Sequence, residues 1–201
     1  MDLVCLDLEG VLIPEIWIAF AEKTGIDALR ATTRDIPNYD DLMRQRLDLL
    51  DHHGLTLSEI QGVIEGLEPL AGAQNFLTSL RESYQVVILS DTFYEFALPM
   101  MRQLDWPTLL CHQLTVNTED RITDYVLRQA DPKRHAVEAF RNLNYRIFAA
   151  GDSYNDTTML AAADAGFLFK APLNVTREFP QFKSTDDYDT LRALIDEVAA
   201  H

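Results

Sequence analysis

Two acidic clusters each follow a short apolar segment that is typical of a buried strand. The segment 2–7 ends at Asp7, and the segment 146–150 is followed two residues later by Asp152 and then by Asp156. Because ligands of open parallel sheets collect beyond the carboxyl ends of the strands, we expect these carboxylates to share one site. Hard cations such as Mg²⁺ prefer oxygen ligands. The sequence therefore predicts a site that holds a hard cation and does carboxylate chemistry beside it.

Two further polar groups occupy a predicted strand end or helix start. Ser90, Asp91 and Thr92 follow an apolar segment at 85–89, and Lys133 follows an Asp-Pro pair that can begin a helix. Each group alone is explained as well by a helix cap, a turn or a solvated first-turn residue. Their significance therefore depends on their combination with the two acidic clusters.

Taken together and in this order, the four groups resemble the four motifs of the haloacid dehalogenase superfamily of phosphohydrolases. The segment 7–11 (Asp-Leu-Glu-Gly-Val) is similar to the first motif, Ser90 to the second, Lys133 to the third and the segment 151–156 (Gly-Asp-Ser-Tyr-Asn-Asp) to the fourth. The match is closest to the phosphoserine phosphatase branch, and within it to the bifunctional phosphoserine phosphatase/homoserine phosphotransferase type. The resemblance spans the chain. It implies an α/β fold with a doubly wound, Rossmann-like parallel sheet and a small helical cap inserted after the first strand.

The pattern of expected elements agrees with that organisation. Helices are expected from Pro14 to Gly25, over 40–53 and over 60–67, the last announced by a capping box at 56–59. Strands at 85–90, 146–150 and 166–169 then alternate with helices, which is typical of a parallel sheet. The segment 108–127 is ambiguous between a further sheet strand and a small hairpin. We expect a core of residues 1–13 and 71–201 and a helical cap of residues 14–70.

The resemblance implies a covalent mechanism with Mg²⁺ as the cofactor. Asp7, the backbone carbonyl of Glu9 and Asp152 would bind the ion, and Asp156 would hold a metal-bound water. Asp7 would attack the phosphate ester and become an aspartyl phosphate. Glu9 would protonate the leaving alcohol and then deprotonate the acceptor.

The same resemblance assigns the phosphate contacts. Ser90 and the backbone N–H groups of Asp91 and Thr92 would bind phosphoryl oxygens at a helix start. Lys133 would neutralise charge on the nucleophile and on the phosphate, and Asn155 would meet Lys133 or the substrate.

The resemblance also implies phosphoserine and homoserine as small-molecule substrates. Arg46 falls where the phosphoserine phosphatases place the arginine that binds the substrate carboxylate, and its planar fork suits that role. Glu15 lies near the position of their acidic residue for the amino group.

One position departs from the family pattern. The residue two places after the nucleophile is usually Asp, whereas this chain has Glu9. One extra methylene moves the carboxyl group by roughly 1.5 Å, a shift comparable to those that cost about a hundredfold in rate. Our hypothesis is that Glu9 disfavours hydrolysis of the phosphoenzyme relative to transfer onto a substrate hydroxyl.

Composition excludes several classes of partner. A net charge of -15 disfavours nucleic-acid binding, because phosphates would be repelled. No segment approaches the roughly 20 apolar residues that a membrane span needs, and we expect a cytoplasmic protein with no membrane partner. Cys5 and Cys111 are expected to be buried, and the five histidines show no metal-site spacing and are interpreted as surface or packing residues. The sequence leaves open whether the chain is a monomer or a homodimer.

Four alternatives remain at this point. A phosphorylated receiver domain also uses a strand-end Asp, a Ser or Thr, a Lys and Mg²⁺, but its acidic pair precedes the phosphorylated Asp. A dehalogenase of the same fold needs no metal and would leave the Asp152/Asp156 pair unexplained. A phosphatase of this fold that acts on another small phosphate ester, and a noncatalytic phosphoserine-binding protein, are the other two.

Overall fold

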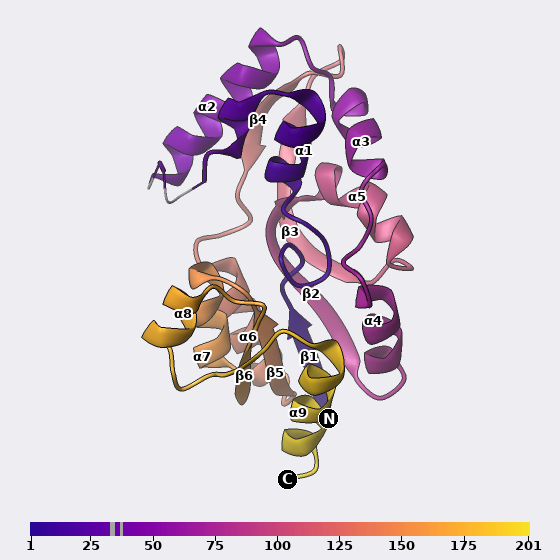
Figure 1. The fold of residues 1–201 in the computed structure, drawn as a ribbon, viewed down its shortest axis with the longest axis vertical. Helices are drawn as coiled ribbons and strands as arrows, with labels where there is room; N and C mark the ends of the chain where they lie inside the picture. Colours follow the sequence, from indigo (N-terminus) through magenta and orange to yellow (C-terminus); the bar gives the residue numbers. More distant parts are fainter. Residues whose placement is uncertain (33–34, 37) are drawn as a thin grey trace.

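A computed structural model describes residues 1–32, 35–36 and 38–201. Within them the chain forms a sheet of seven strands in the order β4-β3-β2-β1-β5-β6-β7, in which every neighbouring pair is parallel except β3 and β4 (Figure 1). The strands are β1 (Asp2–Leu6), β2 (Gln85–Phe93), β3 (Thr108–Val116), β4 (Ile122–Val126), β5 (Arg146–Gly151), β6 (Ala165–Phe169) and β7 (Lys183–Thr185).

Helices cover both faces of this sheet, because its strands are apolar on both sides. In β1, Leu3 and Cys5 face one buried cluster, whereas Val4 and Leu6 face the other. The first of these clusters includes residues of α6 (Pro132–Asn142), α7 (Thr157–Ala162) and α8 (Leu173–Glu178), and the second includes residues of α4 (Ala73–Arg81), α5 (Tyr94–Gln103) and α9 (Tyr188–Ala199). The predicted doubly wound parallel sheet is confirmed.

The predicted helical insertion after the first strand is also confirmed. Between β1 and α4 the chain forms α1 (Ile16–Thr24), the 3-10 helix η1 (Asp27–Arg30), α2 (Tyr39–His52) and α3 (Leu57–Glu65). In Figure 1 they lie beyond one end of β1, β5 and β6, beside β4. The capping box at the start of α3 forms as expected, since Thr56 and Glu59 exchange hydrogen bonds. The first helix begins later than expected, because Glu15 is its N-cap residue and Pro14 precedes the helix.

The ambiguous segment 108–127 forms both of the structures considered for it. The first half of β3 pairs in parallel with β2, and its second half pairs with β4 as an antiparallel hairpin. This hairpin reaches the inserted helices, where Asp124 pairs with Arg44 of α2 at 3.2 Å and the Asp120 carbonyl accepts from the Leu57 backbone N–H of α3. Strand β3 therefore belongs both to the parallel sheet and to the hairpin that contacts the insertion.

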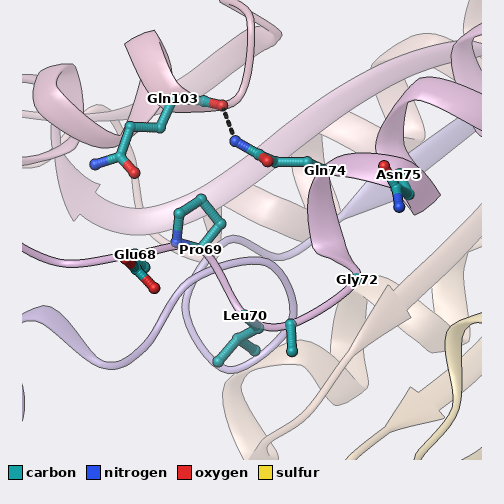
Figure 2. Close-up of a pocket in the computed structure, with 8 residues that line it drawn as sticks. Glu68, Pro69, Leu70, Gly72, Gln74, Asn75 and Gln103 are labelled. Carbon is teal, nitrogen blue, oxygen red and sulfur yellow. Dashed lines mark hydrogen bonds between the residues drawn. The ribbon is translucent and has the colours of Figure 1, made fainter.

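The two connections between the insertion and the sheet lie side by side. The Leu70 backbone N–H donates to the Leu12 carbonyl at 2.9 Å. Gln103, at the end of α5, donates to the Leu67 carbonyl at 2.9 Å, and its own carbonyl accepts from the Gln74 side chain at 2.6 Å (Figure 2). A surface pocket of about 320 Å³ opens beside these contacts. The segment that leads from α3 to α4 is thus held in place by hydrogen bonds at Leu67 and Leu70.

Candidate active site

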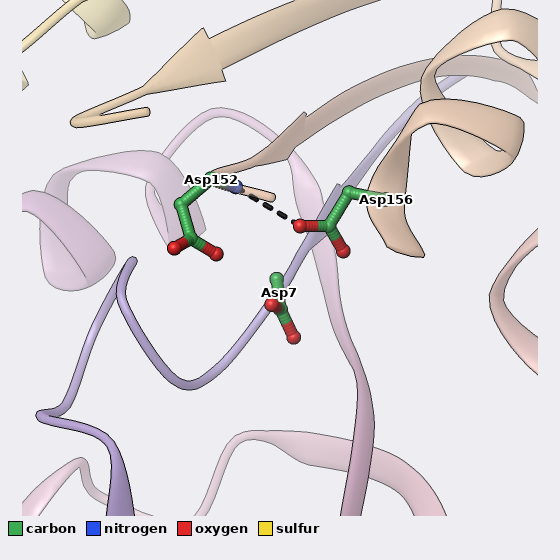
Figure 3. Close-up of side chains that lie close together, drawn as sticks. All are labelled: Asp7, Asp152 and Asp156. Atoms are coloured by element: carbon green, nitrogen blue, oxygen red, sulfur yellow. Dashed lines mark hydrogen bonds between the residues drawn. The ribbon is translucent and has the colours of Figure 1, made fainter. Parts of the chain in front are cut away.

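Three carboxylates meet where β1 and β5 end. Asp7 directly follows β1, and Asp152 and Asp156 follow β5. One oxygen from each lies within 4.8 Å of the other two, and Figure 3 shows the three side chains converging. The sequence predicted this meeting from the strand ends alone. A pocket of about 320 Å³ at the return from the insertion and another of about 230 Å³ between α3 and α5 include none of these residues.

Two glycines make this close approach possible. Gly10 has a φ of +77°, and a Cβ atom there would lie 2.5 Å from a carboxylate oxygen of Asp152. A Cβ atom at Gly151 would lie 2.4 Å from the Asp156 side chain. Either added methyl group would displace a carboxylate of the cluster.

Asp156 forms more hydrogen bonds with the protein than we expected. It is 0% exposed, and its Oδ2 atom accepts from the backbone N–H groups of Asp152 and Ser153, both at 3.0 Å. Asp152 and Asp156 are four residues apart but do not share an α-helix. Residues Tyr154–Asp156 form a short 3-10 helix that is capped by Ser153. Asp156 thereby holds the loop that carries Asp152.

Lys133 lies among three carboxylates, those of Asp7, Asp91 and Asp156. Its Nζ atom is 2.7 Å from Asp156, 2.9 Å from Asp7 and 3.5 Å from Asp91. The side chain comes from the second residue of α6, which agrees with the predicted helix start, and the residue is only 2% exposed. Burial lowers the pKa of Lys133, but attraction to these carboxylates outweighs that effect and holds the pKa well above its ordinary value. Lys133 is therefore a charged ammonium.

The carboxylates carry more negative charge than one ammonium can neutralise. Burial and repulsion by Asp156 raise the pKa of Asp7 well above its ordinary value, although Lys133 opposes them. Burial and the same repulsion raise the pKa of Asp152 to about 7. A bound cation would relieve both effects.

These residues fit Mg²⁺. Asp7 and Asp152 supply oxygen ligands on adjacent strand ends, the excess of negative charge favours a divalent cation, and glycines leave room for it. The backbone carbonyl of Glu9 as a third ligand and a water held by Asp156 stay predictions.

The phosphate-binding residues predicted at 90–92 lie in the strand. We expected the strand to end at Ser90 and a helix to begin there, but β2 continues irregularly to Phe93 and α5 begins at Tyr94. The Ser90 hydroxyl accepts from the Thr92 backbone N–H at 3.2 Å, so this part of the strand turns locally. Ser90 and Thr92 are buried, and Asp91 reaches Lys133.

Asn155 contacts Asp91 directly. Its Nδ2 atom donates to Asp91 Oδ2 at 2.7 Å, so that Asp91 links it to Lys133. The sequence predicted Asn155 to meet Lys133 or the substrate, and no direct contact between Asn155 and Lys133 is found in the described residues.

Glu9 connects the carboxylate site to the inserted helices. Its Oε1 atom accepts from the backbone N–H of Ile16, the first residue of α1, at 2.7 Å. Burial and repulsion by Glu15 raise the pKa of Glu9 to about 8, although the charges of Arg46 and Lys133 oppose this rise. Glu9 thus interacts electrostatically with Lys133 at the strand ends and with Arg46 in the insertion.

Arg46 is buried within the insertion. It lies on α2, is 8% exposed, and its guanidinium stacks over the Trp17 ring with 4.4 Å from Cζ to the ring centroid. It donates to the Ala31 carbonyl at 3.0 Å, and its Nε atom has no hydrogen-bond partner within the described part of the chain. Its hydrogen bonds go to Met43 and Ala31, and no carboxylate of the described residues forms a direct ion pair with it. Burial lowers the pKa of Arg46 to about 10, although Tyr39, Glu9 and Glu15 oppose this effect. A buried guanidinium that forms no direct ion pair with a carboxylate of the described residues is suited to binding an anionic ligand.

Sequence reasoning missed His112. The side chain is buried beside Asp91, with 3.8 Å between Nε2 and Asp91 Oδ1. Its place in an apolar strand gave no signal of this contact, because only the pairing of β3 with β2 brings the two residues together. As predicted, both cysteines are buried and free.

The chain belongs to the haloacid dehalogenase-like hydrolase family, whose model matches residues 1–164. It is 66% identical over 192 residues to Phosphoserine phosphatase ThrH of Pseudomonas aeruginosa, a match that covers 96% of this chain and 94% of that protein. It is also 66% identical to a phosphoserine phosphatase of Pseudomonas syringae, with 96% of this chain and 81% of that protein covered.

Solved structures share the fold. A phosphoserine phosphatase in its apo form superposes with a TM-score of 0.77 at 20% identity, over 97% of this chain and 98% of that one. A substrate-bound phosphoserine phosphatase complex gives 0.77 at 18% identity, over 98% and 97%. Membership of the hydrolase family is inconsistent with a receiver domain. Among the described residues, no helix is long and apolar enough to cross a membrane.

Proposed function

We propose that the protein is a Mg²⁺-dependent phosphoserine phosphatase that also transfers the phosphoryl group to homoserine. The observation that carries the proposal is the convergence of Asp7, Asp152 and Asp156 at the ends of two neighbouring strands, where Lys133 pairs with Asp7 and Asp156. The names of the two relatives that are 66% identical support phosphoserine as the substrate.

In this proposal the Asp7 carboxylate attacks phosphorus, and the bond between phosphorus and the serine oxygen breaks. Glu9 gives a proton to that oxygen, so that serine leaves as an alcohol. Glu9 then takes a proton from the acceptor hydroxyl as it attacks the aspartyl phosphate, and Asp7 is regenerated. Lys133 and Ser90 bind the phosphoryl oxygens. Mg²⁺, held by Asp7, Asp152 and the Glu9 carbonyl, would offset the repulsion between carboxylate and phosphate.

The substrate's amino-acid part would be bound by the insertion. Residues 14–70 form the cap, and residues 1–13 and 71–201 form the core. Arg46 binds the carboxylate and Glu15 the ammonium group. The guanidinium of Arg46 is buried and forms no direct ion pair with a carboxylate of the described residues, which supports the first assignment. Homoserine carries the same two groups, so one cap serves both ligands.

The central experiment is incubation with phosphoserine and Mg²⁺, with and without homoserine, while free phosphate and phosphohomoserine are measured separately. We expect phosphate alone in the first reaction, both products in the second, and neither after chelation of the metal. Phosphoethanolamine, which lacks the carboxylate, should be a much poorer substrate. Equal turnover of the two phosphate esters would show that the carboxylate is not recognised, and would count against phosphoserine as the substrate.

Replacing Arg46 by Lys is expected to raise the KM for phosphoserine by about 10- to 100-fold, because a lysine loses the bidentate contact with a carboxylate. Steady-state kinetics on phosphoserine and phosphoethanolamine test this, since only the first should respond. Arg44→Lys is the matched control: Arg44 lies on the same helix but is 59% exposed and pairs with Asp124. An unchanged KM in Arg46→Lys would remove Arg46 from the substrate site.

Replacing Glu9 by Asp is expected to raise the ratio of free phosphate to phosphohomoserine by about tenfold, because a shorter side chain leaves space for water beside the phosphoenzyme. The shorter side chain also loses the hydrogen bond that the Ile16 backbone N–H donates to Glu9 Oε1 at 2.7 Å. Glu9→Gln is the control: it keeps an acceptor oxygen but cannot exchange a proton, so both products should slow together. An unchanged product ratio in Glu9→Asp would discard the hypothesis.

A further inference from the structure

His112 lies at the point where β3 changes its pairing partner. It is the last residue of β3 paired with β2, opposite Phe93, and the next residue, Gln113, already pairs with β4. The imidazole is 4% exposed, so its two ring nitrogens must be satisfied within the protein.

The hydrogen bonds of the ring define its tautomer. Nδ1 accepts from the Arg128 backbone N–H at 3.0 Å. A ring nitrogen that accepts an N–H carries no proton, and the proton of the neutral ring must therefore be on Nε2. Nε2 lies 3.8 Å from Asp91 Oδ1. This distance is longer than a direct hydrogen bond, so the polar N–H group acts on the carboxylate at short range without a direct bond.

The second oxygen of Asp91 faces the groups that act on phosphate. Oδ2 lies 2.7 Å from Asn155 Nδ2 and 3.5 Å from Lys133 Nζ. Burial raises the pKa of Asp91, but Lys133, His112 and Asn155 together hold it well below its ordinary value. Asp91 is therefore an anion whose Oδ2 atom contacts Asn155 and Lys133, while its Oδ1 atom lies near His112.

We propose that His112 is a positioning residue, which orients Asp91 so that Asp91 holds Lys133 and Asn155 in place around the phosphoryl group. The proposal rests on the proposed function, since it assigns that role to Lys133. A second contact acts on the same segment, because the Arg128 side chain donates to the Pro132 carbonyl, next to Lys133, at 2.9 Å.

Two substitutions of His112 distinguish the roles of its two ring nitrogens. His112→Asn places an oxygen near Nδ1 and keeps the acceptor for Arg128, but it loses the donor toward Asp91. His112→Gln places an NH₂ group near Nε2 and keeps that donor, but it loses the acceptor. We expect His112→Asn to lower kcat by about 10- to 100-fold, as is typical for residues that orient catalytic groups, with KM changed by less than about threefold. His112→Gln should keep kcat within about threefold of wild type and have the lower Tm of the two variants.

A purely structural role would lower kcat in step with Tm in both variants, and that result would overturn the proposal. The kinetics can be measured with phosphoserine or with para-nitrophenyl phosphate, so failure on phosphoserine alone would count against the proposed substrate and not against His112. A readout independent of activity is ¹⁵N NMR of the histidine-labelled, metal-free protein. We expect a neutral His112 ring with an unprotonated Nδ1 and an Nε2 signal that moves in Asp91→Asn. A proton on Nδ1, or an Nε2 signal that Asp91→Asn leaves unchanged, would overturn the proposal even if the protein turned over neither ester.

Discussion

Replacing Asp7 by Asn is expected to abolish both hydrolysis and transfer, with kcat at least about 10⁴-fold below wild type, because the amide cannot form the aspartyl phosphate. The substitution keeps the shape of the side chain, which is buried beside Lys133. Acid quenching followed by mass spectrometry should find a phosphoryl group on the peptide that contains Asp7 in the wild type and none in the variant. A phosphorylated variant would place the nucleophile elsewhere.

The same variant should be at least as stable as the wild type in the absence of metal. Burial and repulsion by Asp156 raise the pKa of Asp7, which means that the folded state disfavours its charged form. At neutral pH, above the unfolded pKa of Asp7, this carboxylate therefore costs folding free energy, and a neutral amide removes that cost. Thermal melts with added chelator test this, with the exposed Asp186→Asn as the matched control. A strongly lowered Tm would mean that lost activity reflects unfolding.

Replacing Lys133 by Met is expected to have the second largest effect, a loss of at least about 10³-fold in kcat/KM. It removes the ammonium that lies 2.9 Å from Asp7 and 2.7 Å from Asp156. Removing one partner of a buried ion pair leaves the other uncompensated, so we expect the free energy of unfolding to fall by about 3–5 kcal/mol. Steady-state kinetics and urea unfolding measure the two effects.

Lys183→Met is the matched control for this substitution. Lys183 pairs with Glu197 at 3.0 Å, but both side chains are 61% exposed. An exposed ion pair contributes only about 0–1 kcal/mol, and this variant should keep its activity. If the free energy of unfolding fell equally in both variants, Lys133 would not be needed to stabilise the buried carboxylates in the folded protein.

Much of the carboxylate site could be predicted because its members are fixed by strand ends. Asp7 and Asp152 follow buried strands, and Lys133 follows a proline that begins a helix. Local sequence marks the ends of these two strands and the start of this helix, so these three positions are readable without a structure. The sheet order then brings β1 beside β5, as expected of this fold.

The remaining contacts depend on pairing between distant segments. Ser90 was expected at a helix start, but the irregular pairing of β2 with β3 extends the strand to Phe93. The same pairing places His112 beside Asp91, which no periodicity in either segment indicates. Arg46 was found through the family resemblance, whereas its stacking on Trp17 depends on how α1 and α2 pack.

The double pairing of β3 limits how the insertion can be exchanged between proteins. A chimera that replaced only residues 14–70 would graft foreign helices onto the native β3–β4 hairpin. It would lose the Arg44 side chain that pairs with Asp124, and the backbone hydrogen bond from residue 57 to Asp120 would form only if the foreign helix lay in the same place. A transplant designed to change substrate preference should therefore include residues 113–126 as a second, separate fragment.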